Sequence, residues 1–241
     1  MVAEMATSSN LELLINKLDS SVKLILTIIA TLLLPFALQA QAQTTIKLRD
    51  SAGNELSNAV VWAADDAVKA GARMTPQQVN IDQVNRQFTP FMTVIRKGSE
   101  VTFPNSDNIR HHVYSFSEPK PFEIKLYANE ERPTLAFEQA GLVTLGCNIH
   151  DQMIAHIVIT ERESAWISNA AGVVELPLVA ANGSVAVTIW HPWMGTDLAT
   201  ARTIKIEPGT SNTLTLEVTP PQREEKPKSR LQQRFNRTGS L

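Results

Sequence analysis

Segments in which apolar and polar residues alternate run through most of the 241-residue chain. This alternation places every second side chain on one face, as in a β-strand that buries one side. Pro, Gly, Asn and Asp separate the segments, as expected for turns. The segments are 44–50, 58–64, 91–105, 111–117, 121–128, 134–147 and 153–161. Short strands at regular spacing predict an all-β fold of the sandwich or barrel type.

The pattern restarts near Ser164 and predicts a second, smaller antiparallel β-module. Its segments are 165–179, 183–194 and 201–220, and the last contains the alternating stretches TIKI and TLTLEV. We therefore expect one β-domain over 43–162 and a small module over 163–219. The stretch between Ala63 and Val84 is less regular, and a short helix near 76–84 is one interpretation of it.

Both ends of the chain differ from this pattern. The apolar run 24–38 follows Lys17 and Lys23 and precedes an A-x-A-like site at Ala40 and Ala42, which predicts a secretory signal peptide over 1–42. The alternative is an N-terminal anchor that is not cleaved. Because the leading region is long for a signal peptide, a start of translation at Met5 or a later residue is a further alternative. Residues 220–241 are polar and mostly basic, which predicts a disordered tail.

Charge and cysteine content narrow the possible functions. The formal net charge is -2, so nothing indicates a nucleic-acid partner. Export to the periplasm would leave no stable membrane span after signal cleavage. Exported proteins usually pair their cysteines, yet Cys147 is the only one in the chain. Cys147 is therefore a buried apolar residue, a partner for another chain, or a ligand.

The neighbours of Cys147 favour the ligand interpretation. His150 and Met153 follow at three-residue intervals in the stretch GCNIHDQM. Thiolate, imidazole and thioether together suit copper, and a blue-copper site combines two His, one Cys and a weak axial Met. The second histidine must come from elsewhere, and the adjacent His111 and His112 are the candidates.

The approach to these histidines resembles the cupredoxins, the plastocyanin and amicyanin type of single-copper proteins, and this resemblance implies a Greek-key β-sandwich for the first domain. In that family a strand with the pattern V-x-F-x-N precedes H-x-V, with the histidine six residues after the asparagine. Val101, Phe103 and Asn105 match, and His111 lies six residues after Asn105. The resemblance implies that His111 is the ligand and that the Asn105 side chain ties the two ligand-bearing segments together. A simple turn asparagine is the alternative for Asn105.

The second family motif, G-x₅-C-x-x-H-x-x-M, is matched by Gly141, Cys147, His150 and Met153. The resemblance covers about 88–160 and is nearest to exported plastocyanin-like proteins of the "methylamine utilization protein" type. The smaller module resembles carboxypeptidase-regulatory or transthyretin-like β-modules, with a weaker match.

The sequence does not fix the register of the strand that carries His111 and His112, so the choice of the first histidine ligand stays open. Adjacent residues on a strand point to opposite faces, so only one of His111 and His112 reaches the site. The spacing from Asn105 favours His111, and a shifted register would select His112. His156, within an apolar strand, and His191, between Trp190 and Trp193, are expected to be structural.

The resemblance implies a periplasmic one-electron carrier with one type 1 copper ion, held by His111, Cys147, His150 and Met153. Its expected partner is a dehydrogenase or c-type cytochrome that docks transiently, and the carrier is expected to be a monomer and not an enzyme. A copper-delivery protein with the same ligands is the alternative. A zinc or thiol site using Cys147 and His150 is a third hypothesis, although the sequence offers no positioned general base for it.

Overall fold

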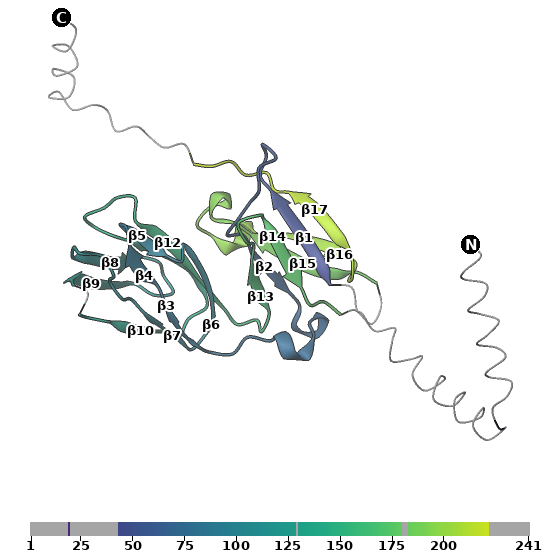
Figure 1. The fold of residues 1–241 in the computed structure, drawn as a ribbon, viewed down its shortest axis with the longest axis horizontal. Coiled ribbons are helices and arrows are strands. Elements are labelled where there is room, and N and C mark those ends of the chain that lie inside the picture. Colours follow the sequence, from purple (N-terminus) through teal and green to yellow (C-terminus); the bar gives the residue numbers. More distant parts are fainter. Residues whose placement is uncertain (1–18, 20–42, 129, 180–182, 222–241) are drawn as a thin grey trace, which may run out of the picture. The chain divides into compact units, whose positions relative to one another are not determined.

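The computed structural model describes residues 19, 43–128, 130–179 and 183–221. Regular structure in these residues consists of β-strands and short 3-10 helices, so the all-β prediction is confirmed (Figure 1). The expected signal peptide (1–42) and basic tail (220–241) lie almost wholly outside the described residues. Among those described, no helix has the length and apolar character needed to cross a membrane.

One group of strands lies between Gln78 and Thr160. It forms a five-stranded sheet in the order β6-β12-β11-β8-β9, a three-stranded sheet β10-β7-β3 and a hairpin β4-β5. The bounds are β3 (Gln78–Asn80), β4 (Asp82–Val84), β5 (Gln87–Thr89), β6 (Met92–Arg96), β7 (Ser99–Thr102), β8 (His111–Ser115), β9 (Phe122–Tyr127), β10 (Thr134–Phe137), β11 (Gly141–Gly146) and β12 (Ile154–Thr160). The short helix expected near 76–84 is wrong, because this stretch forms β3 and β4.

A second group of strands comes from both ends of the described chain. It forms the sheets β14-β1-β17 and β13-β2-β15-β16. The strands are β1 (Thr44–Arg49), β2 (Val60–Ala63), β13 (Ala165–Ile167), β14 (Val173–Leu176), β15 (Val185–Trp190), β16 (Arg202–Ile206) and β17 (Ser211–Thr215). The 3-10 helices are η2 (Asp65–Ala67), η3 (Ala70–Ala72), η4 (Pro192–Met194) and η5 (Leu198–Thr200).

The partners of β1 and of β2 do not follow the domain boundary that the sequence predicts between residues 162 and 163. The sequence predicts that 44–63 belongs to the first domain, but β1 pairs with β14 and β17, and β2 pairs with β13 and β15. The second module is also not purely antiparallel, because β1 and β17 run parallel. Alternation in TTIKLR shows that one face is buried, but it carries no information on which strands become neighbours.

The buried apolar residues form three clusters that follow this arrangement. One lies among the second group of strands and includes Ile46 and Leu176, and another lies among the first group and includes Phe103 and Ile157. The third contains residues of both groups, Trp62 and Trp190 with Met92 and Val158 among them. The segment from β3 to β12 is thus an insertion between β2 and β13, with a shared apolar junction.

The site residues lie where β8 meets β11. β11 and β12 form an antiparallel hairpin in which Gly146 pairs with Ile154, so the loop Cys147–Met153 closes it. β8 is the other neighbour of β11, and Tyr114 pairs with Gly146. His111, at the start of β8, is therefore brought to the same end of the sheet as Cys147.

Candidate metal centre

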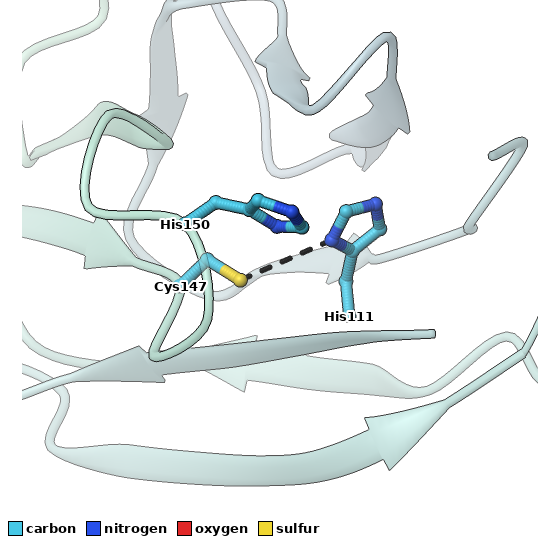
Figure 2. Close-up of side chains that lie close together, drawn as sticks. All are labelled: His111, Cys147 and His150. Carbon is cyan, nitrogen blue, oxygen red and sulfur yellow. Dashed lines mark hydrogen bonds between the residues drawn. The ribbon is translucent and has the colours of Figure 1, made fainter. Parts of the chain in front are cut away.

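Three side chains meet at this end of the sheet. Ligand atoms of His111, Cys147 and His150 all lie within 4.8 Å of one another (Figure 2). The Nδ1 atom of His111 is 3.9 Å from the Sγ atom of Cys147, and the rings of His111 and His150 are 5.1 Å apart between centroids. A metal ion with bond lengths of about 2.0 Å to nitrogen and 2.3 Å to sulfur fits between two atoms so spaced.

Burial at the three residues supports metal binding. His111 has 0% and Cys147 4% relative exposure, and His150 is half-buried. The Nδ1 atom of His150 is buried and has no hydrogen-bond partner among the described residues. An unpaired buried polar atom costs about 1–3 kcal/mol, and coordination to an ion would remove that cost. The donors are therefore one thiol and two imidazoles, and one imidazole nitrogen lacks a hydrogen-bond partner among the described residues. Such a set of donors suits copper.

Met153 lies in the same apolar cluster as Cys147 and is 1% exposed. Its backbone N–H donates to the carbonyl of His150 at 2.9 Å, which closes a tight turn between the two residues. This turn keeps the sequence-predicted axial residue next to the site. Its assignment as the axial ligand stays a prediction.

Of the two candidate histidines, His111 joins Cys147 and His150, and His112 faces another way. The Nε2 atom of His112 lies 3.0 Å from a carboxylate oxygen of Glu123 on β9. Its ring also approaches that of Tyr114, with 5.7 Å between centroids. The pairing of β8 with β9 is irregular between His111 and Val113. Such irregularities re-aim side chains and are common next to functional sites.

Asn105 organises the loop that leads to His111. Its side-chain Nδ2 donates to the carbonyls of Ile109 at 2.9 Å and of Tyr127 at 3.0 Å. The first bond closes the 105–110 loop and the second holds it to β9, whereas the family resemblance predicts a tie to the other ligand-bearing segment. The side chain is more than a turn residue, because it fixes where β8 begins.

Asp107 was not identified from the sequence. Its Oδ2 atom lies 2.7 Å from Nε2 of His111, the ring nitrogen that faces away from Cys147. Burial raises the pKa of the Asp107 carboxyl, but backbone N–H donation from Arg86 and contact with His111 outweigh this and hold the pKa below its usual value. The only sequence signal was an acidic residue four positions before a candidate ligand, which is too common to be informative.

His156 and His191 lie outside this group, as expected of structural residues. The Nδ1 atom of His156 lies 3.1 Å from the hydroxyl of Thr144, and Nε2 of His191 lies 3.1 Å from the carbonyl of Ser57. Burial lowers the pKa of each ring to about 4, so both are neutral at pH 7.

Comparison with known proteins gave structural neighbours only. No protein-family model and no curated protein matches the chain. A Cu-containing nitrite reductase from Thermus scotoductus SA-01 is 27% identical over 39% of this chain and 25% of its own, with a TM-score of 0.34. The chain thus spans a quarter of that protein's length.

Two smaller neighbours match along nearly their whole length. A novel purple cupredoxin from Nitrosopumilus maritimus is 19% identical over 34% of this chain and 99% of its own, with a TM-score of 0.31. A mutant of amicyanin in its reduced Cu(I) form is 17% identical over 42% of this chain and 98% of its own, with a TM-score of 0.33.

Proposed function

We propose that this chain is an exported, periplasmic type 1 copper protein that carries one electron at a time between redox partners. The observation that carries the proposal is the convergence of His111 Nδ1, Cys147 Sγ and the ring of His150, whose buried Nδ1 has no hydrogen-bond partner among the described residues. When bound, copper would supply a centre that alternates between Cu(I) and Cu(II).

Each residue has a distinct task in this proposal. Cys147 would provide a thiolate, His111 and His150 would provide imidazole nitrogens, and Met153 would provide a thioether sulfur to hold the ion. The β8 strand and the β11–β12 hairpin hold these donors in place, so little rearrangement accompanies a change of charge. All four side chains act as ligands in this scheme, and none is left as nucleophile or general base. We therefore propose a carrier and not an enzyme.

The Cys147–Met153 loop is the proposed docking surface for the partner. Ile149 is 48% exposed, and the neighbouring His150 is half-buried, so this loop brings a ligand close to solvent beside an apolar side chain. A dehydrogenase or a c-type cytochrome that docks through a small interface would fit this role. We propose that the carrier itself is a monomer when it docks.

Copper delivery with the same ligands is the second candidate, and burial argues against it. A delivery protein must release its ion by ligand exchange, but His111 and Cys147 are almost fully buried. A buried site favours retention of the ion through redox cycles. Repeated reduction and oxidation with no loss of copper to a competing chelator would separate the two functions.

The first test is the visible spectrum of the chain from Gln43 onward after loading with Cu(II). An intense thiolate-to-copper band is expected, and Cys147→Ala should abolish it. His111→Ala should abolish or alter the band, whereas His112→Ala should leave it in place as the matched control. A folded wild-type protein without this band would contradict the proposal.

A further inference from the structure

We propose that Asp107 is the positioning residue for His111. Its carboxylate, held by the tip of the β4–β5 hairpin, fixes the ring so that Nδ1 presents its lone pair toward Cys147. This inference rests on the proposed function, because it assigns a role within the same metal centre. It connects the centre to the hairpin tip, a segment that supplies none of the proposed ligands.

The contact between the two side chains determines the tautomer of the ring. An ionised carboxylate only accepts hydrogen bonds, so the Nε2 atom at 2.7 Å from Asp107 must carry the proton. In a neutral ring the other nitrogen is then an acceptor. That nitrogen, Nδ1, lies 3.9 Å from the sulfur of Cys147. The arrangement thus prepares a metal-binding lone pair before any ion arrives.

Asp107 is itself held by the turn between β4 and β5. The backbone N–H of Asn85 donates to its Oδ1 at 2.7 Å, and that of Arg86 donates to its Oδ2 at 2.9 Å. Both turn residues have positive φ, 53° and 58°. Successive N–H groups in such a turn form a concave anion-binding site, and here the anion is a carboxylate from the chain.

Arg86 is an unfavourable residue for its position in this turn. Two consecutive residues with positive φ in a hairpin strongly favour Asn-Gly, and Asn85 occupies the first position. Arg86 occupies the second, where a side chain adds strain. Occupation of both N–H groups by Asp107 helps to stabilise this conformation.

The loop side of the contact is also fixed. The N–H of Asp107 donates to the side-chain oxygen of Asn105 at 3.0 Å. Both the backbone N–H and the hydroxyl of Ser106 donate to Asp82 on β4, at 3.1 and 2.7 Å. The ring of His111 is 0% exposed and has no room to turn away, and the carboxylate of Asp107 is held by the two backbone N–H groups of the turn. Carboxylates that hold a metal-binding histidine in this manner typically contribute 10–100-fold to metal affinity.

The first measurement is the protonation of the His111 ring in the metal-free, unaltered chain. In the neutral ring, long-range ¹H–¹⁵N NMR should show the proton on Nε2 and none on Nδ1. A neutral ring with its proton on Nδ1 would overturn the proposal. Because no copper and no substitution are involved, this result stands whether or not the chain proves to be an electron carrier.

The second measurement compares Asp107→Asn with Glu123→Gln. Glu123 is a suitable control, because its carboxylate lies 3.0 Å from the neighbouring His112. We expect Asp107→Asn to lower Cu(II) affinity about 10–100-fold in chelator competition, to lower Cu(I) affinity less, and so to raise the reduction potential. Glu123→Gln should match the wild type.

Three outcomes are informative. If Asp107→Asn keeps the Cu(II) affinity, the Cu(I) affinity and the reduction potential of the wild type, the positioning role is overturned. This holds even if the wild-type chain shows the thiolate-to-copper band. A wild type that binds no copper would reject the proposed function, and the NMR result alone would then decide whether Asp107 sets the tautomer. If Asp107→Asn does not fold, the NMR result on the unaltered chain decides likewise.

Discussion

At the scale of single residues, Gly146 determines how closely β8 and β11 approach beside the proposed ligand Cys147. A Cβ atom placed on Gly146 would lie 2.7 Å from Cζ and 2.8 Å from the hydroxyl oxygen of Tyr114. The Tyr114 ring therefore lies directly over the backbone of the residue before the cysteine. Glycine is needed here for space, since its φ is not in the left-handed region.

Gly146→Ala should consequently disturb both stability and the metal centre. Because the ring of Tyr114 must move, we expect a loss of about 1–3 kcal/mol in unfolding free energy. We also expect a shifted thiolate-to-copper band. Denaturant unfolding and the visible spectrum measure the two effects.

In a Tyr114→Ala background, Gly146→Ala should cost little further stability, because the clash is removed. Gly71→Ala is the matched control, since nothing lies within 4 Å of a Cβ there and its φ is not positive. Equal stability of Gly146→Ala and wild type would show that the ring moves at little cost.

At the scale of elements, a buried hydroxyl helps to join the two segments that flank the inserted strands. Ser168, just after β13, accepts a hydrogen bond from the N–H of Ala59 at 2.9 Å and donates to the carbonyl of Leu56 at 2.8 Å. Ser168 thus joins the chain entering β2 to the chain leaving β13. These segments flank the inserted strands on either side.

Ser168→Ala should cost about 1–3 kcal/mol of unfolding free energy, because buried backbone groups of Ala59 and Leu56 lose their partner. Thermal unfolding of the metal-free chain would measure the loss. The exposed Ser211 on β17 provides the control, and Ser211→Ala should change little. A loss confined to copper-loaded protein would contradict the structural role.

The elements also show how far the sequence could be interpreted. Alternation and turn residues predicted the strand segments that hold β11 and β12 on either side of the Cys147–Met153 loop, since both signals are local. The partners of β1 and β2 could not be predicted, because pairing across the insertion depends on contacts far apart in sequence. Asp107 was missed for a similar reason, since its importance comes from a hairpin tip that only the fold brings near.

At the scale of the whole described chain, the apolar junction joins the inserted strands to the surrounding ones. His156 of β12 packs edge-on to Trp190 of β15, with 6.4 Å between ring centroids. His191 follows directly, and its Nδ1 accepts a hydrogen bond from the N–H of Trp193 at 3.2 Å. Two neutral histidines are therefore buried at or beside the junction.

This burial predicts that acid weakens the fold. Above pH 6.5 both rings are neutral whether folded or unfolded, so their burial carries no protonation cost. As pH falls toward 4, the unfolded chain binds protons that the folded chain excludes, because both folded-state pKa values are about 4. Each ring should then remove stability on the order of 3 kcal/mol.

The metal centre must be excluded as the source of this effect, so the measurement uses metal-free Cys147→Ala protein. Its unfolding free energy should fall steeply between pH 6.5 and pH 4.5. Adding His156→Gln, which keeps polar atoms near the Thr144 hydroxyl, should flatten the dependence by removing one of the two buried histidines at or beside the junction. Carboxylates titrate in both proteins, so the difference between the two curves isolates the histidine. Parallel curves would show that His156 is protonated without opening the junction, and that the inserted and surrounding strands are not coupled through it.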